Sequence, residues 1–166
     1  MASGFTAGTW VDVGIGEGLA LEAMEVRAGL LLGVEFRGDK LAAALRRLPG
    51  AVGVQADAGM LPIISRGADV VTCLEVLEHL DAPERAVEEL ARISRGHCVV
   101  SVPWEPFFRL GNLCRGKDVR RLGNNPEHVQ HFRPSSLKVL LRGHFEDVTV
   151  RPSFPWIIGV ATNPSS

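Results

Sequence analysis

Short apolar runs alternate with segments of helical periodicity along most of this chain. Runs rich in Val, Ile, Leu and Ala predict strands, and they cover residues 9–15, 30–36, 51–56, 68–74 and 97–102. Between these strands the apolar residues recur with a helical period, which predicts helices over residues 19–27, 39–48 and 81–94. Continuous apolar strands that alternate with helices are typical of a parallel sheet covered on both faces.

The last third of the chain departs from this alternation. Its pattern predicts a helix over residues 135–142, followed by two strands over 145–151 and 156–161. A short turn containing proline joins these two strands, so we expect an antiparallel pair. We therefore predict an α/β fold: a Rossmann-like, doubly wound, mostly parallel seven-stranded sheet with the antiparallel pair at its C-terminal end. Residues 1–166 form a single predicted domain, with an insertion at about 104–133.

Composition narrows the function classes. The formal net charge is −1, which gives no general attraction to nucleic acid. The three cysteines show no C-x-x-C spacing, so a reduced, cytoplasmic protein is favoured over a disulfide scaffold. We expect no signal peptide, because the first residues lack a basic segment followed by a long apolar one, and no apolar run reaches the roughly 20 residues that span a bilayer. Nothing in the composition indicates an obligate protein partner.

A glycine-rich turn follows the first predicted strand. The apolar run ends at Gly14, Gly16 and Gly18, and the first predicted helix begins directly afterwards. Glycines let a ligand approach the backbone closely, and a helix N-terminus offers free N–H groups. This turn is suited to a nucleotide-like ligand, with a purely structural turn as the alternative. A dinucleotide fingerprint would need its third glycine at position 19, which is Leu19.

Acidic residues follow the next two predicted strands. Glu35 lies twenty-one residues after Gly14, and Asp57 ends the third strand. Because the carboxyl ends of parallel strands meet at one edge of the sheet, these acids and the glycine turn should line one crevice. A carboxylate at Glu35 can accept hydrogen bonds from two ribose hydroxyls, which alone is also compatible with NAD.

Two motifs together resemble a known family. Asp12 precedes a G-x-G-x-G turn by two residues, as in motif I of class I S-adenosylmethionine (SAM) methyltransferases. The heptad after the fourth strand, residues 74–80, resembles ubiquinone-biosynthesis-type O-methyltransferases (methyltransferase type 11), a branch that acts on small molecules. The resemblance extends from about Trp10 to Trp156. It implies SAM as cofactor, S-adenosylhomocysteine as product, and cofactor contacts by Asp12, Gly14, Gly16, Gly18, Glu35, Asp57, Ala58 and Leu74.

The resemblance also implies individual roles in the cofactor site. Asp12 would support the ammonium group of the methionine part. Asp57 would face the adenine amino group, and the N–H of Ala58 would face the ring.

Glu75, Glu78 and His79 follow the fourth strand at helical spacing. If a helical turn begins there, the three side chains share one face. The E-x-x-E-H spacing resembles that of ubiquinone-biosynthesis methyltransferases and of small-RNA 3′-terminal 2′-O-methyltransferases, in which the set holds a divalent cation. The later histidine of that set would be His128. Such ligands suit Mg²⁺, Mn²⁺ or Zn²⁺. The alternatives are a catalytic role for His79 or His128 as a general base or substrate contact, and a structural role.

The predicted insertion suggests what the acceptor is. Residues 104–133 are locally basic, and their first part is aromatic and apolar. This composition suits an amphipathic or anionic acceptor and peripheral contact with a membrane; RNA phosphates and simple packing are the alternatives.

We therefore predict a SAM-dependent methyltransferase that acts on a small or lipid-like acceptor at oxygen. One alternative is an RNA 3′-end 2′-O-methyltransferase with an E-x-x-E-H metal site, although the near-neutral charge disfavours nucleic acid. The other alternative is a catalytically silent SAM-binding accessory protein. It is suggested by the nine residues before Trp10, where the resembled families carry a longer segment.

Overall fold

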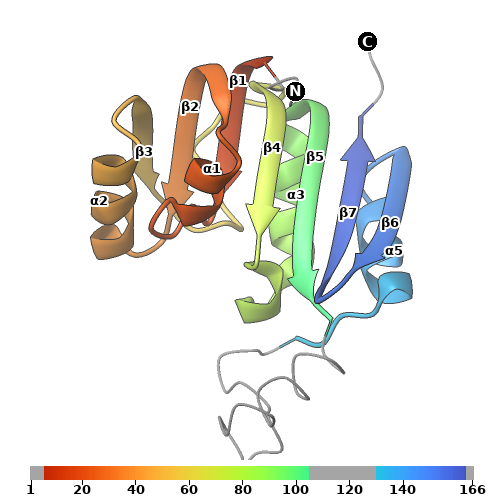
Figure 1. The fold of residues 1–166 in the computed structure, drawn as a ribbon. Helices are drawn as coiled ribbons and strands as arrows, with labels where there is room; N and C mark the ends of the chain where they lie inside the picture. Colours follow the sequence, from red (N-terminus) through yellow and green to blue (C-terminus); the bar gives the residue numbers. More distant parts are fainter. Residues whose placement is uncertain (1–5, 105–129, 164–166) are drawn as a thin grey trace, which may run out of the picture.

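The computed structural model describes residues 6–104 and 130–163. These residues form a seven-stranded sheet in the order β3-β2-β1-β4-β5-β7-β6 (Figure 1). The strands are β1 (Thr6–Val13), β2 (Arg27–Glu35), β3 (Ala51–Gln55), β4 (Ala68–Leu74), β5 (Ser94–Pro103), β6 (Asp147–Ser153) and β7 (Trp156–Thr162). The helices are α1 (Leu19–Ala23), α2 (Gly38–Arg47), α3 (Pro83–Ile93) and α5 (Pro134–Arg142), with a 3-10 turn η1 (Leu77–His79).

The strand order confirms the predicted doubly wound sheet. β1 pairs in parallel with β2 on one side and with β4 on the other, so the chain winds outward in both directions from the centre. β7 lies between β5 and β6 and is antiparallel to both, which confirms the predicted antiparallel end. The order reverses between β1 and β4, where ligands bind in open sheets of this kind.

Helices cover the two faces of the sheet unequally. α3 and α5 pack on one face, where α3 buries Ala86, Val87, Leu90 and Ile93. Pro83 is also buried, and Pro83, Ala86, Val87 and Leu90 follow the i, i+3, i+4, i+7 pattern of an amphipathic helix. On the other face, α1 and α2 share a smaller apolar cluster beside β2. The larger core fixes the strands whose carboxyl ends carry the predicted site.

The first helix is shorter than its sequence pattern predicts. The prediction over residues 19–27 is wrong at its end, because α1 stops at Ala23. Glu25 has a φ of 49°, in the left-handed region that ends helices, and Arg27 already pairs with Thr6 in the sheet. Pairing with β1 therefore replaces the last turn of the helix.

Cys73 and Cys98 are core residues. Both are buried on adjacent strands, β4 and β5. Burial raises the pKa of the Cys98 thiol to about 12 and that of Cys73 well above its usual range. Such thiols are poor nucleophiles at neutral pH.

Most of the predicted insertion, with His128, lies outside the described residues. At its start Trp104 is half-buried against the main core, and its backbone N–H donates to the Pro155 carbonyl at 2.9 Å. At its end Phe132 is buried in the same core. Within residues 6–104 and 130–163, no helix has the length and apolar character needed to cross a membrane.

Candidate functional site

A cavity of about 680 Å³ opens at the carboxyl edge of the sheet, beside the point where the strand order reverses. This volume lies within the range of small-molecule sites. The cavity brings together most of the residues predicted from the sequence. Those that line it are Gly14, Gly16, Glu35, Asp57, Ala58, Leu74, Glu75 and His79.

The turn after β1 is built around its glycines. The N–H groups of Gly14 and Ile15 both donate to the Val34 carbonyl, at 2.8 and 3.0 Å, which fastens the turn to β2. Gly14 has a φ of 81°, and a Cβ there would lie 2.2 Å from a methyl carbon of Val76. Gly16 has a φ of 56°, and a Cβ there would meet nothing within 4 Å. Gly14 therefore serves the close packing of two loops, whereas Gly16 leaves space beside the cavity.

Gly18 has a different role from the other two glycines. It is the N-cap residue of α1 and does not line the cavity. A Cβ at Gly18 would lie 3.1 Å from Leu48 and 3.4 Å from the Cα of Ala44. The third glycine thus lets α1 pack closely against α2.

Asp12 is buried behind the cavity rather than in its wall. Its side chain is 3% exposed and accepts a hydrogen bond from the hydroxyl of Thr72. That hydroxyl oxygen in turn accepts from Nε1 of Trp10 at 3.0 Å. Burial, with a smaller contribution from the charge of Glu35, raises the pKa of Asp12 to about 6 although the Thr72 hydrogen bond opposes the shift. The described geometry gives Asp12 no direct access to the cavity.

Glu35 both shapes the turn and faces the cavity. Its Oε2 accepts the backbone N–H of Gly16 at 3.0 Å, and its Oε1 accepts that of Arg37 at 2.9 Å. A carboxylate oxygen has two acceptor sites, so each oxygen can accept a further hydrogen bond from a ligand hydroxyl. The ligand contact of Glu35 stays a prediction, whereas the anchoring of Gly16 by Glu35 was missed by sequence reasoning.

Asp57 and Ala58 line the cavity from a tight turn after β3. The Oδ1 atom of Asp57 accepts the N–H of Gly59 at 2.7 Å, and its carbonyl accepts the N–H of Met60 at 3.0 Å. These two hydrogen bonds close the turn and hold Asp57 in the cavity wall.

The side chains of Glu75, Glu78 and His79, which follow β4, do not lie on one shared face as predicted. Glu75 and His79 line the cavity, whereas Glu78 is buried at 1% exposure in the interior. The reason is local: Glu75 has a φ of 59° and precedes the turn, and η1 is a tight 3-10 turn over residues 77–79. Ser101 also holds Glu75, through a hydroxyl donated to Oε1 at 3.1 Å.

The predicted metal set is therefore not assembled in the described part of the chain. Residues 6–104 and 130–163 contain no group of three or more His, Cys, Asp or Glu side chains placed to hold a metal ion. The fourth member of the predicted set, His128, lies outside those residues.

Sequence reasoning missed several residues of the cavity wall. They are Val13, Val34, Phe36, Arg37, Lys40, Ala56, Val76 and Leu80. Phe36 and Arg37 directly follow Glu35, and α2 begins one residue later. For Phe36 and Arg37, their position directly after β2 was therefore a signal that could have identified them as residues of the cavity wall.

Comparisons with known proteins agree on one family. The family described as "Methyltransferase domain" matches residues 11–100. The chain is 29% identical over 148 residues to a probable SAM-dependent methyltransferase of Mycobacterium tuberculosis, covering 87% of this chain and 51% of that protein. It is 35% identical over 96 residues to a ubiquinone biosynthesis O-methyltransferase of Pseudomonas paraeruginosa, covering 55% of this chain and 41% of that protein.

The solved structures agree on the fold. A SAM-dependent methyltransferase of Thermotoga maritima superposes with a TM-score of 0.74 at 19% identity, over 95% of this chain and 83% of that chain. The chain spans about half the length of the first curated relatives that it matches, which is 51% for the mycobacterial protein.

Proposed function

This chain belongs to the methyltransferase domain family, and on that premise we propose that it transfers the methyl group of SAM to a small or lipid-like acceptor, at oxygen. One observation carries the proposal. A single cavity joins the glycine turn after β1, the acid at the end of β2 and the acid after β3. These groups match an adenosine-bearing ligand without a pyrophosphate better than a dinucleotide, because the third glycine is Gly18, whereas the dinucleotide fingerprint would need a glycine at position 19, which is Leu19.

The cavity residues fit SAM on structural grounds. The open space at Gly16 leaves room for a ligand against the backbone, and Glu35 has acceptor sites for two ribose hydroxyls. Asp57 and Ala58 would hold the adenine, and the apolar Leu74 would pack beside it. When bound, SAM supplies an activated methyl group on a sulfonium.

Methyl transfer asks little covalent chemistry of the protein. The chain must hold the acceptor oxygen in line with the methyl group and remove its proton. Glu75 and His79 line the cavity next to the end of β4, and Ser101 fixes the direction of the Glu75 carboxylate. We assign His79 as the group that accepts the acceptor's proton, since histidine is the commonest general base. Glu75 would hold the acceptor hydroxyl.

The acceptor class rests on two supports. Residues 104–133 are basic and apolar, which suits an amphipathic acceptor at a membrane surface. Relatives named as ubiquinone biosynthesis O-methyltransferases act, by that name, at oxygen. The RNA alternative is not favoured, because it depends on an E-x-x-E-H set whose Glu78 is buried away from the cavity. No observation favours a silent accessory protein, and the divalent cation has no support in the described residues.

Separate measurements test the cofactor assignment, the methyl-transfer activity and the identity of the acceptor atom. Calorimetry should show S-adenosylhomocysteine binding to the purified protein, with NADH as the control ligand. Production of S-adenosylhomocysteine from SAM is then measured with a hydroxylated aromatic acceptor and with its amine analogue. Absence of S-adenosylhomocysteine binding would refute the cofactor assignment. Transfer to the amine but not to the hydroxyl would refute the oxygen assignment.

A further inference from the structure

The connection between β3 and β4 has no regular structure of its own. Residues 56–67 cross from the outer strand β3 to the central strand β4 without a helix or strand. Parallel strands are usually joined by a helix, whose backbone hydrogen bonds are internal. Here the backbone groups of the connection need partners elsewhere in the fold.

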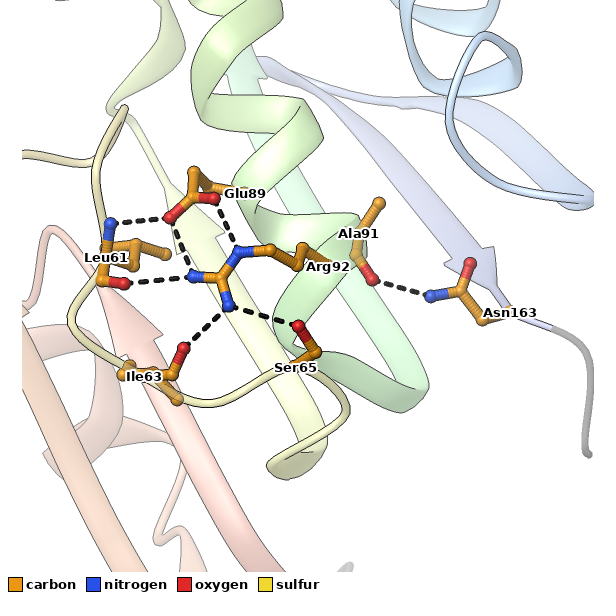
Figure 2. Close-up of polar contacts among 7 residues, drawn as sticks. All are labelled: Leu61, Ile63, Ser65, Glu89, Ala91, Arg92 and Asn163. Atoms are coloured by element: carbon orange, nitrogen blue, oxygen red, sulfur yellow. Dashed lines mark hydrogen bonds and ion pairs between the residues drawn. The ribbon is translucent and has the colours of Figure 1, made fainter.

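Two side chains of α3 supply those partners (Figure 2). Glu89 accepts the N–H of Leu61 at 2.6 Å, and Arg92 donates to the Leu61 carbonyl at 2.9 Å and to the Ile63 carbonyl at 2.7 Å. The same guanidinium lies 3.4 Å from the hydroxyl of Ser65. Together the two side chains hold the connection at Leu61, Ile63 and Ser65.

Glu89 and Arg92 also bind each other. Nε of Arg92 lies 2.6 Å from one Glu89 oxygen, and Nη2 lies 2.8 Å from the other. Their side chains are 17% and 33% exposed, so solvent screens this bidentate pair only partly. The hydrogen bond from Arg92 lowers the pKa of Glu89, which keeps the carboxylate ionised at neutral pH.

This anchor lies close along the chain to the cavity wall. Leu61 follows Asp57 by four positions, and the intervening turn is closed by the hydrogen bonds of Gly59 and Met60 to Asp57. Leu61 itself is 5% exposed in the main core. A closed turn with one end fixed leaves Asp57 and Ala58 little freedom to move.

We propose that Glu89 and Arg92 are positioning residues for the adenine side of the SAM site, because they fix the turn that carries Asp57 and Ala58. This inference rests on the proposed function. Neither residue lines the cavity, so both act through the 57–65 segment. In the sequence the two resemble an ordinary surface pair at i, i+3.

The arginine is essential to this arrangement. Its planar fork donates to two carbonyls and to Glu89 at the same time. A lysine keeps the charge and the helix but presents one ammonium, which cannot reproduce the fork. Arg92→Lys should therefore loosen the connection while leaving α3 folded.

The test is a double-mutant cycle on S-adenosylhomocysteine affinity, measured by calorimetry. In the parent protein, Asp57→Asn should weaken binding about 10-fold or more, the range of a charge-assisted hydrogen bond. In the Arg92→Lys background the same change should weaken binding less than about 3-fold, because a mobile Asp57 contributes little. A merely structural role for Arg92 would leave the two effects equal.

Arg95→Lys is the matched control. Arg95 pairs with Asp69 near the amino end of β4, away from the cavity, so the cost of Asp57→Asn should be unchanged in that background. Glu89→Gln provides a second cycle should Arg92→Lys not fold.

The positioning role would be overturned if Asp57→Asn weakened S-adenosylhomocysteine binding equally in the parent and in the Arg92→Lys or Glu89→Gln background. It would also be overturned if Asp57→Asn bound S-adenosylhomocysteine with the affinity of the parent. A parent protein that binds no S-adenosylhomocysteine would instead overturn the proposed function.

Discussion

Asp12→Asn should change how the stability of this protein depends on pH. Burial raises the pKa of Asp12 from its ordinary value of 3.8 to about 6. Between these values the folded state holds a proton that the unfolded state has released. The contribution of Asp12 to the free energy of unfolding therefore falls as the pH rises through that window. Above about pH 6 Asp12 is ionised in both states, and the destabilisation by its buried charge is complete. Asparagine cannot ionise, so the variant lacks this pH dependence.

The magnitude follows from the two pKa values. The free energy of unfolding of the parent, relative to Asp12→Asn, should fall by about 2 kcal/mol between pH 4.5 and pH 7.5. The buried amide of asparagine carries its own hydrogen-bonding cost, but that cost does not vary with pH and cancels in the comparison. The Thr72 hydroxyl can donate to the asparagine oxygen as it does to the aspartate.

Urea unfolding followed by tryptophan fluorescence at four pH values measures this difference. Asp147→Asn is the control, because it removes a carboxylate that is exposed at the start of β6. Its stability difference from the parent should stay nearly constant over the same range. A constant difference for Asp12→Asn as well would refute the argument that a buried charge destabilises the fold.

Four further substitutions test the site. Gly14→Ala should lower the melting temperature by several degrees, because its Cβ would collide with a valine methyl at 2.2 Å; Gly16→Ala should cost only about 1 kcal/mol of backbone strain and mainly weaken S-adenosylhomocysteine binding. Glu35→Ala should weaken that binding by about 10- to 100-fold in calorimetry, and unchanged affinity would remove Glu35 from the site. His79→Ala should lower kcat by about 100-fold or more, while treatment with a chelator leaves kcat unchanged. Loss of activity on chelation, with recovery on adding Mg²⁺, would restore the cation hypothesis.

The strand ends of the site could be predicted because parallel topology constrains them strongly. Once the apolar runs were identified as parallel strands, the residue after each run had to lie at the same edge. Gly14, Glu35, Asp57 and Leu74 consequently line one cavity. Their placement required only the period of the hydrophobic pattern and the direction of the strands.

Side-chain direction outside regular elements could not be predicted in the same way. The helical spacing of Glu75, Glu78 and His79 suggested one shared face, but a left-handed residue before a 3-10 turn buries Glu78. The role of Arg92 was likewise hidden, since its partners are carbonyl groups of a connection without any periodic pattern. Such contacts depend on tertiary packing, which local spacing does not encode.

The antiparallel insertion of β7 has a consequence for handling the protein on a surface. β1 enters the sheet at Thr6 and runs toward the cavity, whereas β7 begins beside Pro103 and runs away from it to Thr162. The chain therefore enters the sheet at β1 and leaves it at β7 on the same side of the sheet, opposite the cavity (Figure 1). Asn163 fastens the exit there, through its side-chain amide, to the carbonyls of Ala91 and Ser94. A tether attached after this point would orient every immobilised molecule with its cavity facing the solution.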